Sequence, residues 1–545
     1  MVRDAYERVP LMFRSQIDSR CQIQRLVPKA KIQDGEIWAD EWLDSVTDSQ
    51  DYQFSSQVQT KSYQFTWRFI TNSGQDDGVI RPVIGAKGFP YFPGSSMKGA
   101  FWRSCPKKKR PIYCGYEENG ESHPGILRFH GGYPDKEWMS EELVDVVHPQ
   151  EGWQIKGYDN HSAFIQISLY QPQFTFGISS NKTLNEEEWQ EIWQIWEDAI
   201  AQGLGTRVSA GYGQVKLDNR DELNSIISVN LKGQGLASQL ISKEGEFRVN
   251  MFKAALRGHT MRLLGGVTTA EIAEKLTKKL WGGFDGRNGA IVGELGIVFN
   301  PIDLEMNNFT YTPARNSFDM PIYKLEHGVL DILAMGKIKD KRKEHLHKFL
   351  TKILQFSLLL GGFGKSWRRI DHRLFYSDYL DNGNKPMIGC HWEFIKSSTK
   401  LFIPINELSD VTKFLDGVYR NMQNWVEKAS KEELNANGAN WRESFKKDNV
   451  QVWGRIAENR FESEAIYYFH DQDYGIKQSN LTGRMGRVGR IIHRMYPRRV
   501  KQEDKRILPT KQYVELLTIF PDNSDITNNF LNFLGSNASA FQRLW

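Results

Sequence analysis

The sequence predicts an α+β fold made of two similar halves, and three observations lead to this prediction. Short stretches with alternating apolar and polar residues, typical of half-buried strands, are interspersed with segments whose apolar residues recur at helical spacing. In the first half the order is strand, helix, strand, strand, helix, glycine-rich loop and strand, which is a split βαβ arrangement. In the second half a helix, a strand-like stretch, a helix and a glycine-rich loop follow in the same order.

The composition of the 545-residue chain predicts a globular protein of two or three domains. Hydrophobic residues make up 40% and charged residues 25%, and no apolar run approaches the roughly 18 residues of a membrane span. The four cysteines show no CxxC spacing, which argues against a disulfide framework or a zinc site. The first ten residues lack the apolar stretch of a signal peptide, so we expect a cytoplasmic protein.

The first half begins with strand-like stretches and contains two helices. A helix starts after the turn dipeptide Pro93-Gly94, where Ser95 or Ser96 is expected to cap it. A second helix starts at Asn185, with Glu188 completing a capping box and an apolar stripe running to Ile200. The predicted strands of this half are residues 15–26, 63–70, 125–129, 163–170 and 212–217.

The second half repeats this plan at nearly the same interval. From Lys98 to the glycine loop at Gly203 the chain advances 105 residues, and from Lys253 to Gly361 it advances 108. Since a repeated period reflects a repeated architecture, we predict two tandem domains followed by an extension. The predicted boundaries are 1–230 for the first domain, 231–376 for the core of the second, and 377–545 for a C-terminal extension or an insertion that completes the second domain.

The segment 85–103, GAKGFPYFPGSSMKGAFWR, combines a helix N-terminus with basic side chains. Exposed N–H groups and the helix dipole both favour an anion there, and Lys98 and Arg103 add positive charge. The net charge of the whole chain is only +5, but its basic residues are bunched, and 12% of the residues are aromatic and able to stack on bases. These features favour a phosphate-bearing partner.

Three sequence motifs resemble a known family. PGSSMKGAFWR is similar to the Pro-Gly-Ser-Ser-Leu-Lys-Gly-Ala-Leu-Arg signature of the RAMP superfamily, the RNA-binding subunits of CRISPR effector complexes, although Arg103 stands one place later than usual. GLGTRVSAGYG at 203–213 resembles the glycine-rich loop of the family. FKAALRG at 252–258 resembles the first motif without its Pro-Gly-Ser-Ser. The resemblance extends over residues 60–220 and 245–376.

This resemblance implies two tandem ferredoxin-like (RRM-like) RAMP domains with insertions and a C-terminal extension. It implies a guide (CRISPR) RNA-binding backbone subunit of a type III CRISPR antiviral effector complex, a ribonucleoprotein whose partners are guide RNA, target RNA and other effector subunits. In such complexes specificity comes from base pairing, so few sequence-reading contacts are expected.

The RNA-binding candidates come from the motifs and from the clusters of basic residues. A GRM-GRV-GRI run near the C-terminus places an arginine at every third residue beside a glycine, a pattern suited to close phosphate contact, and His493 follows it. The candidates are Ser95, Ser96, Lys98, Arg103, Gly205, Arg207, Gly211, Gly213, Lys253, Arg257, Lys365, Arg368, Arg369, Arg484, Arg487 and Arg490.

Asp76 and Asp77 are the candidate catalytic residues. In RNA-cleaving subunits of type III complexes the catalytic aspartate lies between the first strand and the Pro-Gly-Ser-Ser turn, and Asp77 stands at nearly that place. The resemblance therefore implies metal-dependent endoribonuclease activity on guide-paired target RNA. Asp77 is the candidate metal ligand, and Mg²⁺ is the expected ion.

Two alternatives remain open. One is a metal-independent guide-RNA-processing endonuclease of the same superfamily, with His123 or His130 as general base. The other is a non-catalytic scaffold that binds only protein neighbours. A nucleotide hydrolase is disfavoured, because Leu359 stands where the phosphate-binding loop that GFGKS resembles requires glycine.

Overall fold

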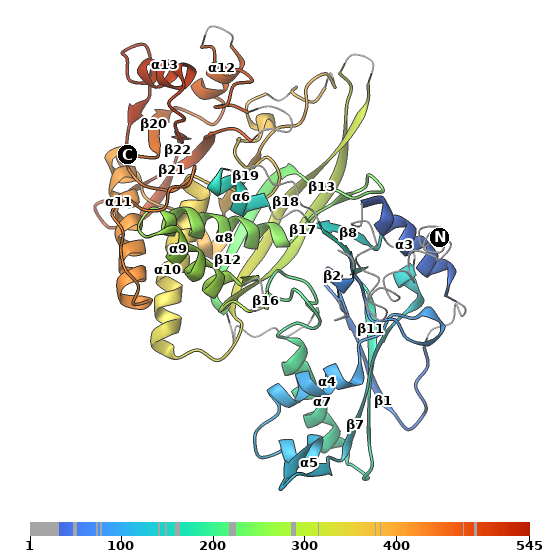
Figure 1. The fold of residues 1–545 in the computed structure, drawn as a ribbon. Coiled ribbons are helices and arrows are strands. Elements are labelled where there is room, and N and C mark those ends of the chain that lie inside the picture. Colours follow the sequence, from blue (N-terminus) through green and yellow to red (C-terminus); the bar gives the residue numbers. More distant parts are fainter. Residues whose placement is uncertain are drawn as a thin grey trace, which may run out of the picture. The chain divides into compact units, whose positions relative to one another are not determined.

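A computed structural model describes residues 32–46, 52–71, 75–76, 79–139, 142–147, 150–157, 164–216, 225–284, 290–313, 316–376, 378–381, 383–471, 474–483 and 488–545 (Figure 1). The chain divides into two compact units. The first contains Met1–Pro149, Ser162–Leu223 and Leu240–Ser242, and the second contains Gln150–His161, Asn224–Gln239 and Lys243–Trp545. Within the described residues, no helix is both long and apolar enough to cross a membrane. The predicted strand at 15–26 lies outside the described residues.

The first unit is organised around an antiparallel sheet of β1 (Gln59–Gln64), β11 (Gln173–Ser180) and β7 (Leu127–Pro134), in the order β1-β11-β7. On the other side of β1 an antiparallel bridge joins Phe65 to Val215. Helices α4 (Gly94–Ser104) and α7 (Glu186–Ile200) share a hydrophobic core with the sheet residues Phe174 and Phe176. Mixed helices and antiparallel sheets are what the predicted α+β class requires.

Helix α7 forms as the sequence predicts. The Asn185 side chain accepts from the Glu188 N–H, and the Glu188 side chain accepts from the Asn185 N–H, which completes the capping box. Ile192, Trp196 and Ile200 are fully buried along one stripe. The prediction of this helix is confirmed. It was possible because the capping box and the apolar stripe both lie within the helix and the residue before it.

The stretch 163–170 forms strands as predicted, but these strands do not belong to this sheet. Residues of that stretch form β9 (Phe164–Ile167) and β10 (Leu169–Tyr170), which belong to two other sheets, and the third strand of the main sheet is β11. Ser168 separates β9 from β10, and its N–H donates to Leu143 O (2.9 Å) instead of continuing the strand. Alternation alone identified a strand here but could not identify its neighbours.

The remaining described elements of the first unit are short apart from α3. A second sheet has the order β3-β4-β9-β8, and β4 runs parallel to β9. The elements are α3 (Ile32–Asp44), β2 (Arg68–Phe69), β3 (Gln75–Asp76), β4 (Val79–Ile80), η2 (Ala86–Gly88), α5 (Arg110–Cys114), β5 (Gly115–Glu118), β6 (Glu121–Pro124), η3 (Lys136–Met139) and β8 (Val144–Val147).

The second unit contains a four-stranded antiparallel sheet in the order β17-β18-β12-β19. Its elements follow the chain order strand, helix, strand, strand, helix, strand. They are β12 (Ser225–Leu236), α8 (Asn250–Gly265), β17 (Leu295–Tyr311), β18 (Phe318–Ala334), α10 (Asp340–Leu359) and β19 (Cys390–Phe394). Strand β19 therefore lies beyond residue 376, where the predicted core of the second domain ends.

Another four-stranded sheet, in the order β21-β22-β20-β23, forms most of the C-terminal part of this unit. Its strands are β20 (Gln451–Ala457), β21 (Ile491–Lys501), β22 (Ile507–Ile519) and β23 (Gln542–Arg543). Helix α11 (Ser409–Asn424) precedes this sheet in the chain and continues in a π-helical turn, η8 (Trp425–Ala429).

Short elements complete the described part of the second unit. They are α6 (Gln150–Lys156), β13 (Ser238–Gln239), β14 (Gly245–Glu246), α9 (Ala270–Trp281), β15 (Gly283–Phe284), β16 (Ala290–Ile291), η6 (His372–Leu374), η7 (Lys396–Leu401), α12 (Glu464–His470) and α13 (Asp525–Leu534).

Candidate functional site

Helix α4 begins at Gly94, at least two residues earlier than a cap at Ser95 or Ser96 would allow. The N-cap residue is Pro93, which makes no side-chain cap hydrogen bond, so Ser95 and Ser96 lie inside the first turn and the predicted capping role is wrong. Because Pro93 provides no side-chain cap, the N–H groups of the first turn receive no hydrogen bond from the N-cap residue. A helix end that binds an anion needs such uncapped N–H groups. Lys98 is exposed one turn further along.

Gly94 is required by the packing of α4 against β7. A Cβ at this position would lie 2.1 Å from the backbone oxygen of Phe129, well inside van der Waals contact. The start of α4 thus touches the sheet backbone directly. Arg103, the other basic candidate of this helix, is exposed in its last turn.

The loop at 203–213 lies against the stretch that continues β1. Gly205 has φ +77°, and a Cβ there would lie 2.1 Å from Ile70 O. Gly213 has φ +62°, and its N–H donates to Arg68 O (2.8 Å). Gly211 also has a positive φ, of +89°. These glycines fix the loop at the end of the first strand, since other residues would clash or be strained there.

Arg207 holds this loop from within. Its Nη1 donates to Gln166 Oε1 (3.0 Å), Gln166 donates in turn to Asp145, and the Tyr212 hydroxyl donates to Asp145 Oδ2 (2.7 Å). Burial lowers the pKa of Arg207. Arg207 is half-buried, and its hydrogen bond to Gln166 gives the guanidinium a structural role. The motif did not reveal this role, because Asp145 and Gln166 lie outside it and only Tyr212 lies within it.

Asp145 and Gln166 belong to the sheet β3-β4-β9-β8 of the first unit, and this sheet also contains the candidate catalytic segment. Gln166 of β9 pairs in register with Ile80 of β4, and β4 pairs with β3, in which Asp76 is opposite Val79. Asp77 and Gly78 join β3 to β4 and lie outside the described residues. The structure thus brings the glycine loop and the strand that contains Asp76 to one sheet.

The start of α4 and the loop at 203–213 approach the same side chain. The Phe92 ring, two residues before α4, lies 6.0 Å from the Phe69 ring between centroids, and a Cβ at Gly205 in the loop would lie 2.9 Å from the Phe69 ring. We call the start of α4 and the loop at 203–213 the first motif edge.

The second unit has an equivalent edge, the second motif edge. Here α8 follows β12, and the glycines at 361–364 follow α10. Lys365 bridges Leu236 at the end of β12, and a Cβ at Gly364 would lie 2.9 Å from Met251 Sδ in the first turn of α8. Lys365 is exposed, whereas the α8 candidates Lys253 and Arg257 are half-buried.

Two other candidates of the second unit are held inside the protein. Arg368 is only 8% exposed and pairs through Nη2 with Glu443 Oε1 (2.9 Å). Glu443 also binds Arg262 Nη2 (2.8 Å). Arg369 donates through Nη2 to Thr482 O (2.7 Å). Both arginines are committed to protein acceptors, so the basic run at 367–369 does not form a surface patch.

The C-terminal arginines are only partly described. Arg484 and Arg487 lie outside the described residues. Arg490 is half-buried, with Nε 3.7 Å from Asp522 Oδ2 and Nη1 donating to Phe520 O (3.3 Å).

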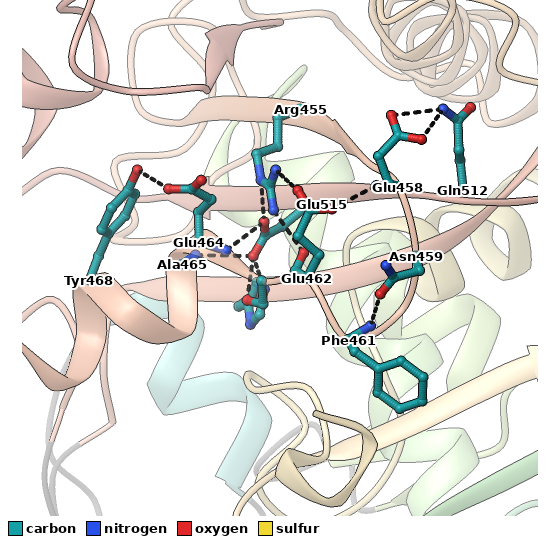
Figure 2. Close-up of polar contacts among 12 residues, drawn as sticks. Arg455, Glu458, Asn459, Phe461, Glu462, Glu464, Ala465, Tyr468, Gln512 and Glu515 are labelled. Carbon is teal, nitrogen blue, oxygen red and sulfur yellow. Dashed lines mark hydrogen bonds and ion pairs between the residues drawn. The ribbon is translucent and has the colours of Figure 1, made fainter. Parts of the chain in front are cut away.

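His493 is buried in a polar network, so it is unavailable to RNA. It donates through Nε2 to Glu515 Oε1 (3.0 Å), and Figure 2 shows Arg455 and the start of α12 converging on the same carboxylate. Arg455 Nε donates to Glu515 Oε2 (2.6 Å), and the Ala465 N–H donates to Oε1 (3.1 Å). Burial alone would raise the pKa of Glu515, but His493 and Arg455 more than offset it and hold that pKa at about 2.

The histidines proposed for an alternative chemistry have other partners. The His130 ring is within hydrogen-bond distance of Ser179 Oγ through Nε2 (2.8 Å), and His123 stacks on Tyr116 with ring centroids 4.6 Å apart. In the described part of the chain, no group of three or more His, Cys, Asp or Glu residues could hold a metal ion.

Comparison with known protein families gives no match, and no curated protein is similar in sequence. Among solved structures, a chain of the type III-B Cmr-beta bound to cognate target RNA is 16% identical, with a TM-score of 0.26 over 38% of this chain and 92% of that one. A chain of a type IV-B CRISPR complex is 15% identical (TM-score 0.20, 29% and 87%), and Cmr6 from Pyrococcus furiosus is 12% identical (0.19, 30% and 98%). At these scores the similarities do not establish the fold of the whole chain.

Proposed function

We propose that this chain is a guide-RNA-binding backbone subunit of a type III CRISPR effector complex, built from two tandem ferredoxin-like RAMP domains. The proposal joins the motif resemblance to a repeated topology. In both units the chain order is strand, helix, strand, strand, helix, strand, and the spatial order of the strands is fourth, first, third, second. That antiparallel order is the one expected of a ferredoxin-like domain, which supports the proposal.

The observation that carries the proposal is the repetition of the motif edge. In each unit the start of the first helix and a glycine loop lie together beside the end of the first strand. Uncapped helical N–H groups bind phosphate oxygens, and glycines let an RNA backbone approach closely. Lys98 is an exposed cation of the first motif edge and Lys365 of the second, and Arg103 is exposed in the last turn of α4. Such contacts hold a backbone without reading its bases.

Cleavage of target RNA is a further part of this proposal. Asp77 belongs to the connection between β3 and β4, on the sheet that anchors the first glycine loop. Mg²⁺ typically needs only one or two protein carboxylates beside phosphate oxygens and water, so a single aspartate is sufficient as the protein ligand. When bound, the ion would stabilise developing negative charge at the scissile phosphate.

Charge reversal at Lys98 tests RNA binding. The matched control is Lys182→Glu, since Lys182 is also exposed and lies between β11 and α7, outside both motifs. Lys98→Glu should weaken binding of single-stranded RNA and lower the slope of log affinity against log salt by about one, as expected for a lost phosphate contact. Lys182→Glu should change neither.

The titration also separates the alternatives. Equal affinity and equal salt slope for wild type and Lys98→Glu would contradict the first motif edge. A wild-type chain that binds no RNA but still joins its protein neighbours would be a scaffold. Cleavage of repeat RNA by the isolated chain in EDTA, lost in His130→Ala, would instead show a processing endonuclease.

A further inference from the structure

The main sheet of the first unit has two different faces. Phe174, Phe176 and Ile178 point to the face that shares a core with α4 and α7. Alternate residues point to the other face, where Ser62 pairs with Thr175 and Thr175 pairs with Tyr133. The residues of this second face are Thr60, Ser62, Gln64, Arg128, Tyr133, Gln173, Thr175, Gly177 and Ser179, none of which carries a carboxylate. We call it the polar face.

A stack of tyrosines stands on the polar face. The Tyr52 and Tyr133 rings are nearly parallel, with centroids 3.6 Å apart and an interplanar angle of 9°. Tyr91 lies at 16° to Tyr133 with centroids 5.7 Å apart. Phe54 contacts both Tyr52 (5.0 Å, 79°) and Tyr133 (5.7 Å, 71°) edge-on. These contacts fix the plane of the Tyr52 ring before any ligand arrives.

Tyr52 remains 45% exposed despite this packing. An immobilised, half-exposed aromatic ring stacks on a nucleobase at little entropic cost, because its orientation is already set. Tyr133 stands near the end of β7, and its neighbour Gly132 bridges Phe92, two residues before α4. The stack therefore lies close to the start of α4, which is part of the first motif edge.

The charge of the polar face matches a polyanion. Within the paired strands Arg128 is its only formally charged residue and is exposed, roughly 15 Å before Tyr133 along β7. The nearest carboxylate is that of Asp135, just beyond β7, whose N–H donates to Gln173 O (3.0 Å). The hydroxyl and amide side chains between them can donate to and accept from bases and sugars. A basic, uncharged-polar and aromatic surface is the composition of single-stranded nucleic-acid sites.

We propose that the polar face binds unpaired bases of single-stranded RNA, with one base stacked on Tyr52 and the adjoining backbone passing toward Arg128. This inference rests on the proposed RNA-binding function and adds a contact that the motif edge does not supply. It also predicts a preference for single strands, since the bases of a duplex are stacked on each other and cannot cover Tyr52.

The test compares Tyr52→Leu with Tyr52→Phe in the full chain, using dye-labelled single-stranded oligoadenylate and fluorescence anisotropy. Tyr52→Leu should weaken binding about tenfold, the typical effect of losing one stacked base, while Tyr52→Phe keeps the ring and should bind as wild type does. Tyr116→Leu is the matched control, because Tyr116 is 47% exposed on β5. Duplex RNA should bind all four proteins equally.

Ser62→Glu is a second variant that leaves the aromatic stack intact. Ser62 is exposed and lies opposite Thr175, so the new carboxylate would repel RNA on the polar face, and binding should weaken here too. Wild-type affinity in both Tyr52→Leu and Ser62→Glu would overturn the inference. So would loss of a protein neighbour at unchanged RNA affinity, which would make the face a protein interface. Lys98→Glu in the same titration reports separately on the proposed function.

Discussion

Gly94 shows how a single residue sets the geometry of the first motif edge. The motif glycine is needed because α4 begins against the backbone of β7, with Phe129 O at the place of a Cβ. Gly99 in the same helix meets nothing closer than Arg103 Nη1 at 3.8 Å. The two glycines of one motif therefore have different reasons to be there.

Alanine at these two positions should act in opposite directions. Gly94→Ala forces the helix away from β7 and should destabilise the first unit by about 1–3 kcal/mol, the usual cost of overpacking. Gly99→Ala should be neutral or stabilising by up to about 1 kcal/mol, because alanine favours the helix. Urea unfolding of the two variants checks this, and equal midpoints would show that α4 does not touch β7 as described.

His372 should make the second unit sensitive to mild acid. Burial lowers its pKa to about 3, even though its hydrogen bond to Ile370 O works in the opposite direction. An unfolded histidine titrates near 6.5, so below that pH the unfolded chain binds the proton and the folded one does not. Stability from this group is complete above pH 6.5 and falls by about 1.4 kcal/mol for each pH unit below it.

Urea midpoints measured at pH 7.5 and 5.5 test this dependence. The shift toward lower urea at pH 5.5 should be smaller in His372→Gln than in wild type, because one of the groups that resists protonation is gone. His347→Gln is the control, since His347 is exposed on α10 and should leave the shift unchanged. A wild-type shift in His372→Gln would contradict the burial of this imidazole.

At the scale of elements, local signals were sufficient for helices and insufficient for sheets. The limits of α7 and the buried stripe of α10 follow from capping residues and apolar spacing that lie within each helix. The partner of β11 could not be predicted, because strand pairing depends on residues far away in the sequence. The repeated order of elements was visible only because the interval between the motifs recurs.

The surface exposure of basic clusters was also predicted wrongly, because it too depends on residues far away in the sequence. Trp367-Arg368-Arg369 looks like a surface patch in sequence, but Arg368 pairs with Glu443 and Arg369 with Thr482 O, acceptors that follow 75 and 113 residues later. A buried carboxylate with several arginine partners leaves no local signature. Likewise Arg207 resembles a free cation in the sequence, but its guanidinium donates a hydrogen bond to Gln166.

The proposed cleavage depends on the connection between β3 and β4. In the assembled complex with Mg²⁺, Asp77→Ala should abolish one cut in the target RNA and leave guide and target binding nearly unchanged, because the carboxylate is not needed for the guide contacts. Mn²⁺ should replace Mg²⁺, since both prefer oxygen ligands. The products are resolved on a denaturing gel.

Asp76→Ala is the control for register in that experiment. It should cut as wild type does, because Asp76 belongs to β3 and the proposed ligand is its neighbour. An unchanged cleavage pattern in both variants would mean that this chain binds RNA and a neighbouring subunit cuts it.

At the scale of the whole molecule, the proposed function gives each of the two units an RNA-binding role. Each places the start of a helix and a glycine loop beside its first strand, and each keeps an exposed cation there. One RNA strand contacting both motif edges would be bound more tightly than either unit alone could bind it.

The most direct measurement is ultraviolet cross-linking of RNA to this chain within the complex purified from its own cells. We expect guide-length, repeat-derived RNA to copurify and to cross-link to peptides from residues 94–104 and 203–213 of the first unit and from 250–265 of the second. Lys98→Glu should reduce the first cross-link without dissociating the complex. A complex that assembles with this chain but shows no RNA cross-linked to either motif edge would contradict the account.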